Sequence, residues 1–208
     1  AICSGAALSP LPTTSNNGIT GTWSPALDNT TTTTYTFTPT AGQCATTNTL
    51  TITVNPKVTP SFAPVGPICS GDTLNALPTT STNAITGTWS PALNNTTTTT
   101  YTGTATVNGC PITATTTVTV NPLPTAPTAT NSTQCGTQIP TASVADTNAF
   151  TTPTFKWYDA ATAGTVVQSS TSTTFTSSIS ATTTFYVAVV HPTTGCESPR
   201  TAVTVSVS

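Results

Sequence analysis

An internal repeat restricts the fold of this chain more than any other feature of its sequence. The stretch ICSGAALSPLPTTSNNGITGTWSPAL begins at Ile2, and ICSGDTLNALPTTSTNAITGTWSPAL begins at Ile68, a shift of 66 residues. The same shift carries TITVNP at 51–56 to TVTVNP at 117–122. Self-similarity at a fixed period indicates tandem copies of one small structural unit.

A third, longer segment keeps the order Cys135, Trp157, Cys196 but differs in detail. Pro-rich stretches at 55–67 and 121–130 separate the copies, and proline suits linkers or edge strands because it cannot donate a main-chain hydrogen bond. Little sequence precedes Cys3, so we expect the first copy to be truncated at its N-terminal end and the chain to start inside a longer array or after a processing cut. The expected domains are repeat 1 (residues 1–54), repeat 2 (residues 55–120) and domain 3 (residues 121–208).

The local pattern predicts strands. TLTITV at 49–54, TTTVTV at 115–120 and TFYVAVV at 184–190 alternate or run apolar as strands do, and clusters of Gly, Pro and Asn separate them. No helical 3.6-residue stripe is present. We therefore predict an all-β fold class of tandem small β-sandwiches.

Charge is scarce, since only 4% of the residues are charged. Threonine replaces charged residues at many positions. It is both β-branched and polar, so it favours strands and keeps the outer face of a sheet hydrated. The cations are Lys57, Lys156 and Arg200. Three cations cannot neutralise a nucleic-acid backbone, so we expect no nucleic acid among the partners of this chain. No apolar run approaches the length of a membrane span, so we expect no membrane insertion.

Six cysteines, two in each copy, predict disulfides, because their spacing matches no metal or redox motif. Fifteen pairings are possible, and the repeat favours the one in which each copy closes on itself. The predicted structural disulfides are Cys3–Cys44, Cys69–Cys110 and Cys135–Cys196. A unit this small buries little core, so a covalent link matters to it, and disulfides imply an oxidising compartment.

Other residues carry weaker signals. Each copy has one tryptophan, and Trp23, Trp89 and Trp157 are predicted to pack in the core against the disulfides, with an exposed sugar-stacking platform as the alternative. His191 is expected in a solvated turn. No nucleophile, base and orienting group recur together, so we expect no enzyme activity, no cofactor and no metal site.

Specific phrases resemble a known group of proteins. FKWYDAATAGTVV at 155–167 and TGCESPRTAVTVSV at 194–207 resemble the Ig-like domains of large secreted proteins of the Bacteroidota. GTWSPA and NTTTTTYT resemble the tandem repeats of flavobacterial surface adhesins, the gliding-motility adhesins among them. The resemblance implies Ig-like β-sandwiches, export by the type IX secretion system and an extracellular, cell-surface location. It also makes Thr73, in DTL at 72–74, a candidate for O-glycosylation.

The function that we expect is structural. The chain would be a repeat segment of a long surface adhesin or extracellular filament, used in attachment or gliding, which spaces a distal adhesive region from the cell. Its partners would be neighbouring repeats, with surface polysaccharide or substratum bound by other regions. The alternatives are a polysaccharide-binding module and a non-catalytic spacer of a secreted hydrolase.

Overall fold

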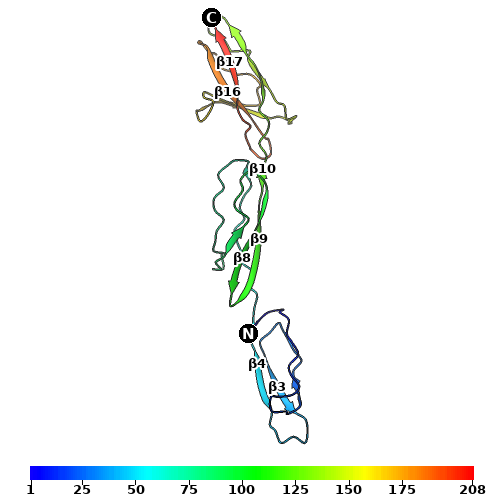
Figure 1. The fold of residues 1–208 in the computed structure, drawn as a ribbon. Helices are drawn as coiled ribbons and strands as arrows, with labels where there is room; N and C mark the ends of the chain where they lie inside the picture. Colours follow the sequence, from blue (N-terminus) through cyan, green and yellow to red (C-terminus); the bar gives the residue numbers. More distant parts are fainter. The chain divides into compact units, whose positions relative to one another are not determined.

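The structure, a computed structural model, describes residues 1–208 and contains strands, turns and irregular segments (Figure 1). No helix that could span a membrane is present. The prediction of an all-β fold is confirmed. The chain divides into two compact units. The first comprises Ala1–Val65, Ala76–Ala92 and Thr100–Thr116, and the second comprises Gly66–Asn75, Leu93–Thr99 and Thr117–Ser208.

Repeat 1 contains a three-stranded antiparallel sheet and a short parallel pair. The sheet has the order β2 (Gly21–Ser24), β3 (Thr33–Pro39), β4 (Asn48–Ile52), and β1 (Ile2–Cys3) pairs in parallel with β5 (Val54–Asn55). The sequence TYTFT alternates as expected, because Tyr35 and Phe37 are buried while Thr34 lies outside and its hydroxyl bonds to that of Thr51 at 2.7 Å.

Repeat 2 uses the same elements. Its sheet has the order β7 (Thr88–Ser90), β8 (Thr99–Val107), β9 (Cys110–Val118), and β6 (Ile68–Cys69) pairs in parallel with β10 (Val120–Asn121). The β8–β9 hairpin, labelled in Figure 1, turns at Asn108 and Gly109, whose φ angles are 51° and 77°. Asn-Gly is the pair that best tolerates two positive φ angles in a tight hairpin turn.

Domain 3 has the largest sheet. Its order is β12 (Ser132–Gln134), β17 (Thr201–Val207), β16 (Thr183–Val190), β14 (Thr154–Tyr158), β15 (Val166–Ser170). A second sheet pairs β11 (Thr128–Thr130) with β13 (Ser143–Ala145). The core between them holds Trp157, which lies against Phe175 and Phe185 with ring centroids 5.8 Å away in each case. Apolar residues of β14, β16 and β17 complete this core, and in β17 the buried Val203 and Val205 alternate with less buried residues.

The Pro-rich stretch at 55–67 is not a free linker, because part of it packs along repeat 2. The Thr82 main-chain N–H donates to the Ser61 carbonyl at 2.8 Å, and the Asn83 side chain donates to the Thr59 carbonyl at 3.0 Å. The Phe62 ring lies against Trp89, 4.8 Å between centroids. In domain 3, Asn148 holds Thr125 in the same way. The stretch at 121–130 ends in the edge strand β11, which is one of the two predicted roles, whereas residues 56–67 form no strand and pack as an irregular segment.

Candidate functional site: the disulfide-joined ends

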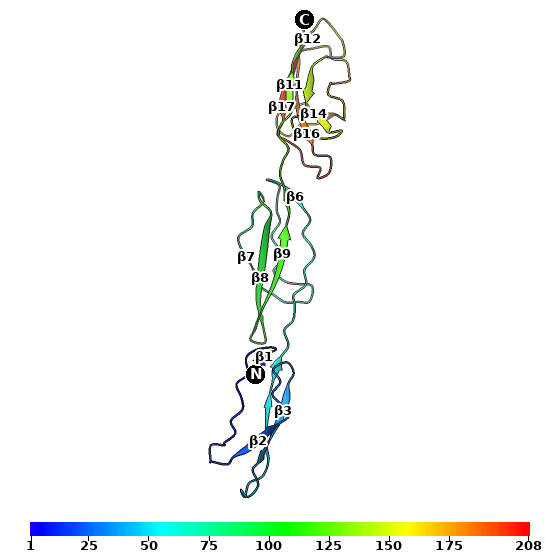
Figure 2. The same ribbon diagram turned by 90° about the vertical axis from the view of Figure 1, so that its right-hand side faces the viewer.

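The disulfide-joined ends begin with the strand β1, which fixes the place of Cys3. In the β1–β5 pair Cys3 lies opposite Asn55, and the next main-chain N–H, of Ser4, donates to the Asn55 carbonyl at 2.9 Å. The N–H of Gly5 then donates to Asn29 at 2.8 Å. Figure 2 shows β1 at the end of repeat 1 away from the β3–β4 connection. The first cysteine therefore lies where the last strand of its own repeat ends.

Cys3 is bonded to Cys110, the first residue of β9, which lies 107 residues away in the sequence. Their Cα atoms are 5.6 Å apart, within the usual range for a disulfide. A hydrogen bond accompanies the bond, because the Asn55 side-chain amide donates to the Asn108 carbonyl at 2.8 Å. The strand end of repeat 1 is thus tied to the hairpin of repeat 2 by one covalent bond and one hydrogen bond.

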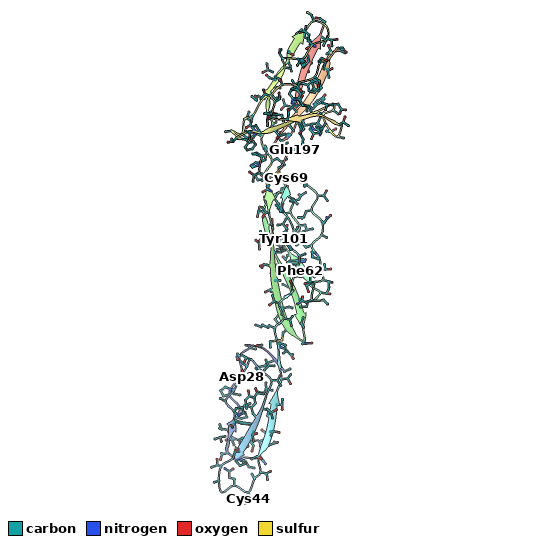
Figure 3. The ribbon with its side chains drawn as sticks, turned by 180° about the vertical axis from the view of Figure 1, so that it is seen from behind. Asp28, Cys44, Phe62, Cys69, Tyr101 and Glu197 are labelled. Atoms are coloured by element: carbon teal, nitrogen blue, oxygen red, sulfur yellow. A yellow bond between two sulfur atoms is a disulfide. The ribbon has the colours of Figure 1, made fainter.

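A second disulfide repeats this relationship. Cys69 lies opposite Asn121 in the β10–β6 pair, and it is bonded to Cys196 of domain 3, with 5.6 Å between Cα atoms and 127 residues between them in sequence. The Cys196 carbonyl accepts from the His191 N–H at 2.8 Å in the turn between β16 and β17. Figure 3 shows the labels of Cys69 and Glu197 close together at this place.

The turn that carries Cys196 is organised by His191. Its Nδ1 accepts from the N–H groups of Thr193 and Thr194 at 3.1 and 3.2 Å, and its ring lies edge-on to Phe150, with centroids 4.7 Å apart. His191 is half-buried, so it is more than the solvated loop residue that we expected. Its role is to shape the cysteine-bearing turn.

The predicted pairings within each copy are wrong. Cys3–Cys44, Cys69–Cys110 and Cys135–Cys196 do not form, and Cys44 and Cys135 are free and exposed. The strand register gives the reason. β3 and β4 pair from Thr33↔Ile52 to Phe37↔Asn48, and Cys44 lies in the connection beyond that second pair. At ~3.4 Å per residue the paired part alone covers roughly 14 Å, twice the ~7 Å that a disulfide permits between Cα atoms.

The opposite ends of repeat 1 are visible in Figure 3, where Asp28 and Cys44 are labelled far apart. Asp28 lies at the Cys3 end, since the neighbouring Asn29 side chain donates to the Ala6 carbonyl at 2.9 Å. In domain 3 the same separation holds. Cys135 follows β12, whose Gln134 pairs with Val207 at the end of β17, whereas Cys196 precedes the start of β17.

The threonine run after Asp28 builds the turn beside Cys3. The Asp28 carboxylate accepts from the Thr30 N–H at 2.7 Å and from the hydroxyls of Thr30 and Thr31 at 2.5 and 2.6 Å. These hydrogen bonds favour the charged form and lower the pKa of Asp28 to about 2. In repeat 2 the neutral Asn94 occupies this position and accepts from the Thr96 N–H at 2.8 Å. Threonine thus stabilises a turn here as well as covering strands.

Most of the charge in domain 3 gathers next to Cys196. Glu197 forms an ion pair with Lys156 and accepts from the Tyr158 hydroxyl at 2.6 Å, and the Arg200 guanidinium lies 3.3 Å from the centre of the Tyr158 ring. Burial opposes ionisation of Glu197, but the hydrogen bonds from Lys156 and Tyr158 outweigh it and lower its pKa. The hydrogen bond to Glu197 raises the pKa of Lys156, and burial raises the pKa of Tyr158.

The three tryptophans differ in burial. Trp157 is fully buried, as predicted, although its ring partners are phenylalanines rather than a disulfide. Trp23 and Trp89 are half-buried. Each of these two donates its indole N–H to a main-chain carbonyl, Trp23 to Pro12 at 2.9 Å and Trp89 to Pro78 at 2.8 Å. The indole N–H groups thus anchor the loop before each strand.

Several residues of these ends carried no sequence prediction. They are Asn55, Asn108, Tyr158, Glu197 and Arg200. Asn-Gly at 108–109 is a recognisable hairpin signal, and it could have placed Cys110 at a hairpin tip. Nothing in the sequence brings Lys156 and Glu197 together, because their contact depends on the pairing of separated strands. No group of three or more His, Cys, Asp or Glu side chains that could hold a metal ion occurs.

Comparison with known proteins identifies one part of the chain. Residues 124–208 match the family described as "Ig-like domain CHU_C associated". An Ig-like domain therefore forms the C-terminal part of an all-β chain. No curated protein matches the sequence. Among solved structures, extracellular domains 3–5 of Drosophila OTK are similar, with 13% identity over 85% of this chain and 71% of that chain and a TM-score of 0.30.

Proposed function

We propose that the chain is a structural repeat segment of a long cell-surface adhesin or extracellular filament, in which Ig-like modules space a distal adhesive region from the cell. The observation that carries the proposal is the staggered pairing of the cysteines, Cys3 with Cys110 and Cys69 with Cys196. Each bond runs from the N-terminal strand of one module to a hairpin or turn of the next. A chain built in this way resists separation of its modules.

The pairing has a mechanical consequence. A force applied to the two ends of the chain enters at Cys3, crosses to Cys110, runs back to Cys69 and crosses to Cys196. Repeat 1 is bypassed, and only roughly 60 residues can be drawn straight, a length of about 200 Å at ~3.4 Å per residue. The reduced chain could be drawn to about 700 Å by the same measure. The disulfides therefore limit extension, as a spacer under tension requires.

The surface composition suits the same role. With 4% charged residues and threonine on the outer faces of the strands, the chain offers few Lys and Arg sites to trypsin-like proteases. Disulfides persist in oxidising surroundings such as the outside of the cell. Both properties fit an extracellular structural role.

Electron microscopy of cells that carry the parent protein tests this function. Gold-labelled antibodies raised against residues 1–208 are expected to decorate thin fibres that project from the cell surface. Treatment with a membrane-impermeant reductant is expected to leave the fibres attached but make them longer under flow. Label confined to the medium, or to compact particles that also carry hydrolase activity, would overturn the proposal in favour of a spacer in a secreted enzyme.

A further inference from the structure

The two free cysteines, Cys44 and Cys135, occupy positions whose repeat equivalents are bonded. Shifting Cys44 forward by the repeat offset gives Cys110, and shifting Cys69 forward by the same offset gives Cys135. Cys110 and Cys69 each form a disulfide to a different module. Cys44 and Cys135 are both exposed. The chain thus presents one unbonded cysteine of the hairpin type and one of the N-terminal-strand type.

Cys135 is held in the geometry of its bonded equivalents. The residue after each N-terminal cysteine donates its N–H to a carbonyl at the end of the parallel partner strand, which is the last strand residue in the two repeats and the next residue, Ser208, in domain 3. The three hydrogen bonds are Ser4 to Asn55 at 2.9 Å, Ser70 to Asn121 at 2.9 Å and Gly136 to Ser208 at 3.1 Å. The backbone around Cys135 has the same hydrogen bond as the backbone around Cys3 and Cys69.

Neighbouring side chains fix Cys135 further. Gln134 is buried, and its side-chain amide donates to the carbonyls of Gly136, Gln138 and Ile179 at 3.1, 3.3 and 3.1 Å. The Gln138 side chain donates to the Cys135 carbonyl at 2.7 Å. The thiol of Cys135 is therefore exposed on a backbone that does not need to rearrange before it reacts.

Cys44 lies in the connection between β3 and β4, the counterpart of the β8–β9 hairpin. Gln43 anchors this connection, because its side-chain oxygen accepts from the Thr20 N–H at 2.9 Å and its nitrogen donates to the Thr20 hydroxyl at 2.6 Å. The register of β3 and β4 keeps Cys44 away from Cys3 in its own repeat. Cys44 therefore needs a partner outside repeat 1.

We infer that Cys44 and Cys135 are the complementary halves of further intermodule disulfides. Cys135 bonds to the hairpin cysteine of another Ig-like module, and Cys44 bonds to the N-terminal-strand cysteine of another. The inference rests on the proposed function, which it deepens by naming the partner: a module of the same kind, on the same polypeptide or on a second copy. Each bond forms from two thiols, which together give up two protons and two electrons. An external low-molecular-weight disulfide takes up both protons and both electrons and is reduced to two thiols.

A second copy of this chain supplies both halves, so the pure 208-residue protein provides the test. Cys135→Ser leaves only the hairpin half, and Cys44→Ser leaves only the strand half. Each variant is incubated in a glutathione redox buffer, alone and mixed with the other. The mixture is expected to give at least ten times more disulfide-linked dimer than either variant alone. Peptide mapping is expected to find Cys44 bonded to Cys135.

The controls show whether dimers form through Cys44 and Cys135 or through misfolding and exchange of the other disulfides. The double variant Cys44→Ser/Cys135→Ser is expected to stay monomeric, and mapping must still find Cys3–Cys110 and Cys69–Cys196 in every variant. Equal dimer yields from single variants and mixture, no dimer in the mixture, or a Cys44–Cys135 bond within one molecule would overturn the inference. The microscopy of the parent protein is independent of all these outcomes, so the spacer function can fail or stand separately.

The source of the partner module is decided on fibres isolated from cells. If the partner is a second copy, reduction converts a high-molecular-weight ladder into a single shorter chain on a denaturing gel. If the partner is on the same polypeptide, a denaturing gel shows a single chain of the same molecular weight before and after reduction. In both arms mapping must find Cys44 and Cys135 bonded to cysteines of other modules, and free thiols at both positions would contradict the inference.

Discussion

Cys3 and Cys110 are joined although they belong to different copies of the repeat and lie 107 residues apart in the sequence. The relationship follows from where the parallel β1–β5 pair places Cys3, at the end of repeat 1 from which the chain passes on to repeat 2. Asn55, the last residue of β5, adds a hydrogen bond to Asn108 in the hairpin that carries Cys110. The strand end and the hairpin that receives it thus belong to one structural contact.

The first prediction concerns the stability that this disulfide provides. The double substitution Cys3→Ser with Cys110→Ser opens a loop of 107 residues. In the loop-entropy model, closing a loop of this length stabilises the folded state by about 4 to 5 kcal/mol because it restricts the unfolded chain. We expect a decrease in the free energy of unfolding of up to that size, measured by urea denaturation. The matched control Cys44→Ser with Cys135→Ser removes only free thiols and is expected to change stability by less than about 0.5 kcal/mol. Equal losses in both double variants would contradict the pairing.

The sequence could predict the modules but not how they are linked. The alternation in TYTFT and the recurring TVNP predict the strands, and the repeat predicts that whatever one copy does the next copy does too. Disulfides within each copy and disulfides from each copy to the next one fit that periodicity equally well. The choice depends on the length of the hairpin that separates Cys3 from Cys44, which only the strand register reveals.

The second prediction concerns the Pro-rich segment that packs on repeat 2. Asn83 holds it through two hydrogen bonds, accepting from the Ser61 N–H at 3.3 Å and donating to Thr59, so Asn83→Ala is expected to cost roughly 1 to 3 kcal/mol. In repeat 1 the equivalent Asn17 accepts only from the Ser15 hydroxyl. Asn17→Ala is therefore expected to cost less than Asn83→Ala. Thermal unfolding of the two variants measures the difference, and equal costs would show that the segment is not held by Asn83.

The third prediction is a pH dependence that belongs to repeat 1. The pKa of Asp28 is lowered from 3.8 to about 2, so its charged form stabilises the folded state above pH ~4, and this stabilisation is lost as the pH falls toward 2. The urea midpoint is expected to fall more steeply over this range in the native chain than in Asp28→Asn. Repeat 2 provides the precedent for that variant, because Asn94 accepts the equivalent hydrogen bonds from Thr96. Identical pH profiles would contradict the assignment, and carboxyl NMR can follow Asp28 directly.

The charged cluster of domain 3 shows a different limit of sequence reasoning. Lys156 and Glu197 are separated along the chain and belong to no motif, yet the pairing of β14 with β16 brings Lys156 opposite Ala188, near the turn that holds Cys196. A contact of this kind depends on the register of non-adjacent strands. Single-residue patterns contain no information about it, whereas burial of Trp157 in the same strand is predicted from its place as the one tryptophan between the two cysteines of its copy.

The last prediction concerns that cluster. Tyr158→Phe removes the hydrogen bond to Glu197 and is expected to lower the free energy of unfolding by about 1 kcal/mol, while keeping the ring on which Arg200 lies. Lys156→Gln removes the ion pair, which is about one third exposed, and is expected to cost at most about 1 kcal/mol because solvent screens it. Lys57→Gln is the matched control, since Lys57 is exposed and forms no ion pair, and it is expected to change little.

The pH dependence of the cluster supplies a second readout. The pKa of Glu197 is lowered, so its stabilising effect is present above the ordinary value of 4.5 and is lost as the pH falls below it. The pKa of Lys156 is raised, so its effect is present below 10.5 and is lost as the pH rises through the raised value. The difference in stability between the native chain and Lys156→Gln should therefore be largest between these limits. A difference that is constant from pH 3 to pH 11 would show that the lysine acts through packing alone.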